Sequence, residues 1–159
     1  MKSNSNYTKK VMEYFTKQKY VGEIKDADGI GKVGNIMCGD IMYVYIKVGK
    51  KGKDEIIKDI KFKTFGCVAA IASSSALAEI AKGKRLIDAV NIDRESILQR
   101  VGGLPPIKTH CSILGEEAIA EAIYDYLKKS KKKIPSEILE KHKRVMKEEQ
   151  AYEKKFCNR

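Results

Sequence analysis

The chain of 159 residues lacks several features that would each point to a common class of protein. It has no Cys-x-x-Cys pair, which excludes zinc-ribbon and thioredoxin-type sites. No apolar run approaches the roughly 20 residues that cross a bilayer, so we expect no membrane contact. The residues after Met1 place no apolar segment behind a basic start, so we expect no secretory signal and a cytoplasmic protein with reduced thiols.

Positive charge exceeds negative charge, with a formal net charge of +11, and the excess is greatest at the C-terminal end. Residues 128–159 hold 12 of the 32 Lys and Arg but only 5 of the 21 Asp and Glu. Such a segment either binds an acidic partner or nucleic acid by counterion release, or is a solvated helical appendage. The chain has no Trp, and residues 128–133 include no aromatic side chain to stack on bases. We therefore expect the appendage, with a nucleic-acid-binding module as the alternative.

Hydrophobic periodicity predicts one helix followed by strands. An apolar stripe at spacings of three and four predicts a helix over 6–18. The glycine-rich stretch 28–35 is interpreted as a strand edge and turn. Alternating apolar residues predict strands over 41–48 and 56–65, joined by a hairpin turn, and consecutive strands favour an antiparallel meander.

Helical signals dominate the second half of the chain. Alanines favour the first of these helices, Asp93 and Ser112 are expected N-caps, and two prolines favour an extended segment at 104–106. The helices are expected over 69–81, 86–90, 93–101 and 112–127, with one more opening at Pro135.

Three of the four cysteines have neighbours suited to metal chemistry. Cys38 is followed by a glycine and Asp40, Cys67 lies at a strand-to-helix junction, and Cys111 follows His110 just before a helix. Thiolate, imidazole and carboxylate bind iron and zinc, and the positive end of a helix favours thiolate. If the fold brings these segments together, all five side chains belong to one site.

Each signal also has an ordinary explanation. A lone cysteine is most often a small buried hydrophobe. A Cys–His–acid nucleophile is open in principle, but it leaves two cysteines without a role. We expect Cys157 to be unligated and His142 to be solvated. Three separate cysteines flanked by glycine, aspartate and histidine are unlikely to occur together by chance, so we expect a metal site.

At this point three motifs are recognisable, in 33–40, 65–70 and 104–112. The chain resembles the IscU family and the N-terminal domain of NifU, the scaffold proteins of iron–sulfur cluster assembly, from about Tyr7 to Lys129. The resemblance implies an α/β (α+β) fold, a three-stranded antiparallel sheet with helices packed on it and the cysteines at one end. It also implies a scaffold domain over 1–129, with 130–159 as a basic helical C-terminal extension.

The resemblance further implies a function that is not enzymatic. A PLP-dependent cysteine desulfurase (IscS/NifS type) delivers persulfide sulfur, iron arrives separately, and a transient 2Fe-2S cluster forms and passes to apo-proteins. By this resemblance Cys38, Cys67 and Cys111 ligate the cluster, and Cys111 accepts the persulfide. Asp40 keeps the cluster labile and can itself ligate, and His110 is the alternative fourth ligand.

Two further expectations come from the same resemblance. A DnaK/HscA-type chaperone recognises the segment that corresponds here to Leu104, Pro105, Pro106, Ile107 and Lys108, with isoleucine where valine is usual. Zinc can occupy the same residues in the apo form, and the sequence does not choose between a monomer and a homodimer. The alternative is a zinc-dependent SufU-type sulfur transfer protein, whose relatives carry an insertion before the second cysteine motif and lack the histidine.

Overall fold

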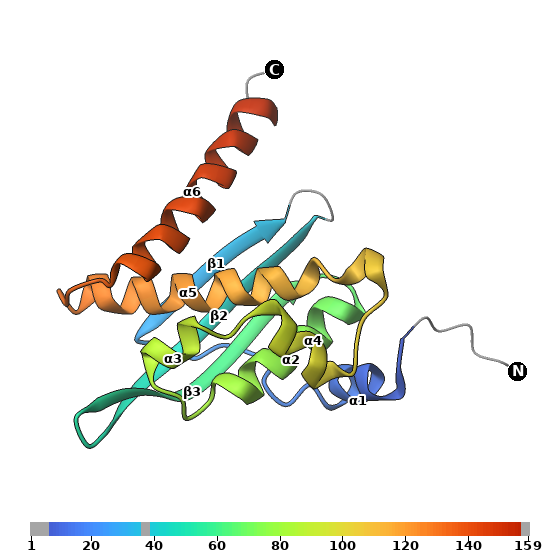
Figure 1. Cartoon of the computed structure of the whole chain (residues 1–159), viewed down its shortest axis with the longest axis horizontal. Coiled ribbons are helices and arrows are strands. Elements are labelled where there is room, and N and C mark those ends of the chain that lie inside the picture. The colour runs from blue at the N-terminus through green and yellow to red at the C-terminus, as the bar shows by residue number, and fades with distance from the viewer. Residues whose placement is uncertain (1–6, 36–38, 157–159) are drawn as a thin grey trace, which may run out of the picture.

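The computed structural model describes residues 7–35 and 39–156, so Cys38 and Cys157 lie outside the described residues. Three strands, β1 (Gly29–Asn35), β2 (Asp40–Lys51) and β3 (Asp54–Phe65), form one antiparallel sheet in the order β1-β2-β3. The helices cover one face of this sheet, giving two layers (Figure 1). The expected fold class is therefore confirmed. Within the described ranges, no helix combines the length and apolarity that a bilayer crossing needs.

The sheet is one-sided because its apolar residues alternate. Met42, Val44 and Ile46 of β2 are buried beneath the helices, whereas Tyr43 and Tyr45 lie on the other face, partly exposed, with their rings stacked at 6.5 Å. Both long strands extend further than the sequence predicted, because pairing continues to Lys51 and Asp54 around a two-residue turn.

Two central helices form the second layer. The Ala- and Ser-rich α2 (Val68–Ala81) is buried on almost every side, between α1 (Lys9–Lys17), β3 and α5 (Cys111–Lys129). Small side chains permit this because neighbouring elements can approach the helix closely. The layer is completed by two short helices, α3 (Leu86–Val90) and α4 (Arg94–Val101), and by a 3-10 turn at Pro106–Lys108.

The cap predictions have mixed outcomes. Asp93 accepts a hydrogen bond from the Ser96 amide and caps α4, as predicted. Ser112 does not cap α5: the N-cap is His110, and the Ser112 hydroxyl donates to the Thr109 carbonyl at 2.6 Å. The predicted extended segment is present up to Pro105, which has φ −53° and ψ 142°, but it ends one residue early because Pro106 opens the 3-10 turn. Proline fixes only its own φ and is compatible with the first turn of a helix, so the second proline did not show where the extended segment ends.

Helix α5 lies directly on β1, and two glycines make this approach possible. A Cβ atom on Gly31 would collide with the carbonyl oxygen of Ala118 and lie 2.6 Å from the amide nitrogen of Ala122. Gly29 meets the Ala122 carbonyl in the same way. The Ile30 amide donates to the Asp125 carboxylate at 2.9 Å, which ties the strand to the helix.

The outer edge of β3 is occupied by other parts of the chain. The Phe62 amide donates to the Tyr20 carbonyl, and the Gly22 amide donates to the Phe62 carbonyl. Further along the strand, Ile57 exchanges backbone hydrogen bonds with residues 83 and 84 in the same manner.

The last helix, α6 (Ser136–Phe156), packs on α5 through its first half only. Ile138 and Val145 are buried, whereas the described side chains from Lys147 to Lys155 are exposed. The second half projects away from the rest of the molecule (Figure 1).

The prediction that His142 is solvated is wrong. Its ring stacks on Tyr124 at 3.7 Å, and its Nδ1 atom lies 3.0 Å from both carboxylate oxygens of Glu121. Both partners come from α5. The charged residues around His142 in the sequence gave no sign of this packing, which exists only once the two helices meet.

Candidate metal centre

The candidate ligands lie where three elements begin, at one end of the sheet. Asp40 is the first residue of β2 and is 7% exposed. Cys67 is the N-cap of α2, and His110 and Cys111 are the N-cap and first residue of α5. Residues up to 71 positions apart in the sequence therefore meet because the strand and both helices start at the same end of the molecule.

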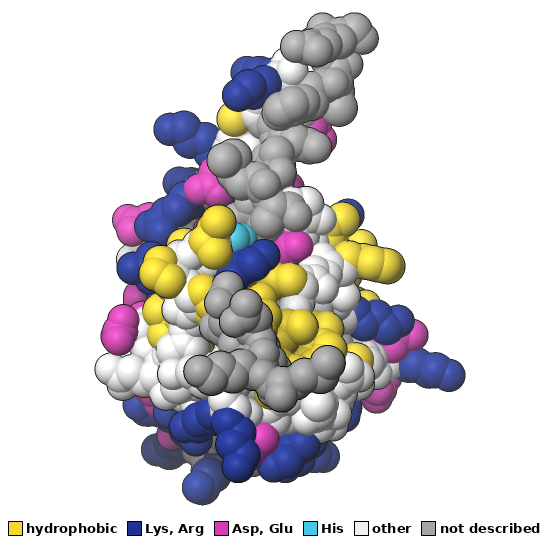
Figure 2. All heavy atoms as spheres, turned by 90° about the vertical axis from the view of Figure 1, so that its right-hand side faces the viewer, with side chains coloured by type: hydrophobic (Ala, Val, Ile, Leu, Met, Phe, Trp, Pro, Cys, Tyr) yellow, Lys and Arg dark blue, Asp and Glu magenta, His cyan; other side chains and the backbone are white. Residues whose placement is uncertain are grey.

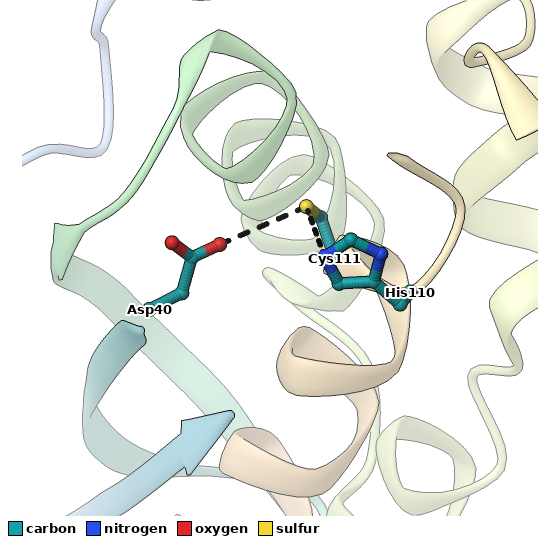
Figure 3. Close-up of side chains that lie close together, drawn as sticks. All are labelled: Asp40, His110 and Cys111. Atoms are coloured by element: carbon teal, nitrogen blue, oxygen red, sulfur yellow. Dashed lines mark hydrogen bonds between the residues drawn. The ribbon is translucent and has the colours of Figure 1, made fainter. Parts of the chain in front are cut away.

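The donor atoms converge on the sulfur of Cys111 (Figure 3). That sulfur lies 3.6 Å from His110 Nε2 and 3.8 Å from Asp40 Oδ2, and one ligand atom from each of the three residues lies within 4.8 Å of the other two. The sulfur of Cys67 lies 3.9 Å from that of Cys111, and the two described cysteines form no disulfide. Tetrahedral ligands at metal–ligand distances of 2.0–2.3 Å are roughly 3.3–3.8 Å apart. The distances from the Cys111 sulfur to His110 and Asp40 fall in this range, so these two pairs have the spacing that a single zinc or iron ion requires.

His110 and Cys111 converge because the backbone is helical where they lie. Adjacent residues point in opposite directions along an extended strand, which would have separated the two side chains. His110 instead has φ −61° and ψ −25°, so its ring turns toward the neighbouring sulfur.

Gly66 allows Asp40 to reach the start of α2. A Cβ atom on Gly66 would lie 2.8 Å from that of Ala70 and 3.2 Å from Cγ of Asp40. Neither neighbour has room to withdraw freely, because Ala70 is fully buried and Asp40 nearly so. The glycine before Cys67 therefore keeps the carboxylate close to the thiols.

Two further polar side chains, Tyr7 and Lys108, lie within electrostatic reach of the thiols. Burial raises the pKa of Tyr7, and the negative charge of Cys67, to which Tyr7 is hydrogen-bonded, raises it further. The charge of Cys67 also raises the pKa of Lys108, with smaller contributions from Cys111 and Asp40. Lys108 thus supplies positive charge beside the anionic ligands. From the sequence, Lys108 was expected only to bind a partner. Tyr7 was assigned no role, because a single tyrosine before the first helix forms no recognisable motif.

The two thiols differ in accessibility. Cys111 is fully buried against Ala69 and Ala70, whereas Cys67 is half-buried. Phe65 and Ile107, each 78% exposed, lie within four residues of a cysteine in the sequence. Figure 2 shows hydrophobic side chains gathered on the face that includes this end of the sheet. The centre is thus bordered by apolar side chains that no other part of the described chain covers.

Comparison with known proteins agrees with this arrangement. Residues 6–133 match the family described as NifU-like N terminal domain. The chain belongs to this family. It is 51% identical over 126 residues to the iron–sulfur cluster assembly scaffold protein IscU 1 of Archaeoglobus fulgidus, covering 79% of this chain and 80% of the relative. It is 46% identical over 123 residues to the IscU scaffold protein of Aquifex aeolicus, covering 77% of each.

Solved structures share the family's fold. A crystal structure from Fervidobacterium islandicum, described as an iron–sulfur cluster assembly scaffold for the SUF system, superposes with a TM-score of 0.59. It covers 76% of this chain and 98% of its own at 21% identity, so the likeness extends to the fold alone.

Proposed function

We propose that this protein is a scaffold on which a transient 2Fe-2S cluster is assembled from iron and persulfide sulfur and then passed to apo-proteins. The observation that carries the proposal is the convergence of thiolate, imidazole and carboxylate donors on Cys111. The scaffold names of relatives at 51% and 46% identity support it.

The proposed ligands are Cys67, Cys111 and Cys38, the last of which lies outside the described residues. Asp40 or His110 supplies the fourth ligand. A cluster held by three thiolates and one nitrogen or oxygen donor is bound less tightly than one held by four thiolates. A scaffold must release what it assembles, so this mixed set suits the function.

Cys111 is the proposed persulfide acceptor. Its thiolate attacks the outer sulfur of a persulfide on a PLP-dependent cysteine desulfurase; the S–S bond of that persulfide breaks, a new S–S bond forms on Cys111, and the desulfurase thiolate leaves. Because Cys111 is fully buried, this step requires the residues around it to move. The scaffold itself catalyses no other reaction in this proposal.

Partner binding is proposed for the segment 104–108, which a DnaK/HscA-type chaperone would recognise through the exposed Ile107. We assign assembly to residues 1–129 and treat 130–159 as an extension. Thiolate ligands require a reducing compartment, which favours the cytoplasm.

Anaerobic reconstitution with iron, cysteine, a desulfurase and a thiol reductant, which supplies the electrons that convert persulfide sulfur to sulfide, tests the proposal. Ultraviolet–visible and Mössbauer spectra with parallel zinc analysis give the result. We expect a labile 2Fe-2S spectrum that is lost in Cys38→Ser, Cys67→Ser and Cys111→Ser and retained in the control Cys157→Ser.

Stable stoichiometric zinc without a cluster, together with faster desulfurase turnover, would instead identify a zinc-dependent SufU-type transfer protein. Native mass spectrometry of the cluster-loaded protein distinguishes a cluster held by one subunit from a cluster shared between the two subunits of a homodimer.

A further inference from the structure

A cleft of about 400 Å³ lies at the end of the molecule opposite the metal centre. It is formed by the β2–β3 hairpin, the start of α3, the end of α5 and the turn into α6, which gather at the same end in Figure 1. Five basic side chains line it: Lys50, Lys53, Arg85, Lys132 and Lys133. Its volume is in the range typical of binding sites.

Part of this positive charge is already neutralised. Arg85 makes a two-pronged ion pair with Asp88 at 2.7 and 3.2 Å. Glu55 receives hydrogen bonds from Lys132 and from the Tyr126 hydroxyl. Burial alone would raise the pKa of Glu55, but these hydrogen bonds outweigh burial and lower it, so the carboxylate stays ionised and paired.

Three lysines remain available. Within the described residues, Lys50, Lys53 and Lys133 form no ion pair, and they come from the hairpin and from the turn before α6. Among the described lining residues the one other acid is Asp54, whose charge acts on Arg85, and the charge of Lys50 acts on Glu55 without a close ion pair. Three lysines without a close ion pair around one open cleft attract an anionic partner.

The lining also has an apolar part. Leu86 and Leu127 form a buried floor, and Ile87, at 42% exposure, offers an apolar contact in the same lining. None of the described lining residues is aromatic, which disfavours stacked bases, and the apolar floor offers nothing to a phosphate backbone. An acidic segment with an apolar side chain matches both parts of the cleft.

We propose that this cleft binds an acidic peptide segment of a partner protein, with carboxylates on Lys50, Lys53 and Lys133 and an apolar side chain on Ile87. Lys132, Lys133 and Pro135 belong to the extension 130–159, so the extension builds one wall of the site. This inference does not depend on the metal centre.

The test is selection of a displayed library of random 12-residue peptides on the full chain, followed by anisotropy titration of an enriched peptide. The site variant is Lys53→Glu/Lys133→Glu, and the matched control is Lys9→Glu/Lys25→Glu, two exposed lysines outside the lining. We expect acidic peptides with an apolar residue, bound about tenfold more weakly by the site variant and less than about twofold more weakly by the control. Zinc binding should be unchanged in both variants.

Four results would overturn the inference: no enrichment, enrichment of peptides without acidic residues, equal binding by the site variant, or equal weakening by the control. Competition experiments with duplex DNA and with inorganic triphosphate test whether the cleft binds one of these anions in preference to the peptide. If either anion binds the cleft more tightly than the enriched peptide does, that anion and not a peptide is the ligand of the cleft. Equal melting temperatures of the variants exclude a folding defect as the cause.

Discussion

Asp40 is the least usual ligand candidate of the centre. It is a carboxylate, nearly buried, with an oxygen 3.8 Å from the sulfur of Cys111. Carboxylate oxygen is a harder donor than thiolate or imidazole and suits cluster iron less well. If Asp40 ligates, it is the contact most readily exchanged.

We therefore expect Asp40→Ala to bind a longer-lived cluster, with decay slowed roughly fivefold, equivalent to about 1 kcal/mol in the barrier. Decay of the visible absorbance under a chelator measures this. Asp59→Ala, which removes a half-buried carboxylate paired with Lys82, is the control. A cluster that decays in Asp40→Ala as fast as in the wild type would show that another residue sets its lifetime.

The sequence predicted the candidate ligands but not their surroundings. Cys67, His110, Cys111 and Asp40 could be chosen because each has a metal-capable or glycine neighbour in the chain. The contact between Tyr7 and Cys67 spans 60 positions and depends on the packing of separate elements, so no local pattern indicates it. The same reason explains the wrong prediction for His142.

The contact between β1 and α5 depends on two glycines of the strand, Gly29 and Gly31, which have no side chain to hold the helix away. A methyl group at Gly31 would meet backbone atoms of Ala118 and Ala122, which cannot rotate away. The same group at Gly34 would come no closer than 3.8 Å to the Asp40 carbonyl oxygen. Gly31 and Gly34 of one strand thus offer a matched comparison.

We expect Gly31→Ala to destabilise the fold by about 3 kcal/mol or more, because β1 and α5 must separate. Gly34→Ala should change stability by less than about 1 kcal/mol. Urea unfolding followed by circular dichroism measures both. Equal stability of the two variants would mean that the strand and helix can shift without cost.

The contact between α5 and α6 contains a carboxyl group that resists ionisation. Burial, followed by the charges of Glu148 and Glu116, raises the pKa of Glu117 to about 7, although Arg144 opposes the shift. Burial also raises the pKa of Glu121, and the hydrogen bond from His142 counters this. The folded protein therefore holds the Glu117 proton to a higher pH than the unfolded chain does.

Stability from Glu117 is fully present below its unfolded pKa of 4.5 and is lost as the pH rises through about 7. We expect Glu117→Gln to be more stable than the wild type at pH 8, by about 1 kcal/mol after allowance for solvent screening, with little difference at pH 5. Thermal unfolding at the two pH values measures this, with the exposed Glu95→Gln as control. A gain at pH 5 as large as that at pH 8 would contradict the assignment.

The type and location of most helices and strands were predicted correctly, whereas the residues at which they begin and end were predicted less well. Apolar alternation in 41–48 and the alanines of 69–81 specify both type and location, because each satisfies a pattern that only one regular structure requires. The end of β2 and the N-cap of α5 were predicted at the wrong residues. Strand pairing and side-chain contacts with other segments determine where β2 ends and where α5 begins. The glycines of 28–35 were predicted to form a strand edge and turn; they form the edge strand β1, which α5 covers, and the strand runs on through Gly29–Asn35 where the turn was expected.

The molecule as a whole consists of a packed body and a helix that is only partly attached. Removing residues 147–159 should lower the melting temperature by less than about 2 °C, because the described side chains there are exposed. Removing 130–159 also removes the buried Ile138 and Val145 and should lower it by about 10 °C. Calorimetry of both truncated chains measures the difference, and zinc binding at 20 °C should survive in each. Equal melting temperatures would show that the first half of α6 does not stabilise the body.

The occupied outer edge of β3 has a consequence for how the protein behaves when crowded. An open strand edge is a template on which a second chain can add, and such additions propagate into fibrils. Here the backbone groups of Phe62 and Ile57 already pair with residues 20–22 and 83–84 of the same chain. Growth of ordered aggregates from this edge therefore requires those segments to detach first, so the folded scaffold can accumulate in quantity without templating its own aggregation there.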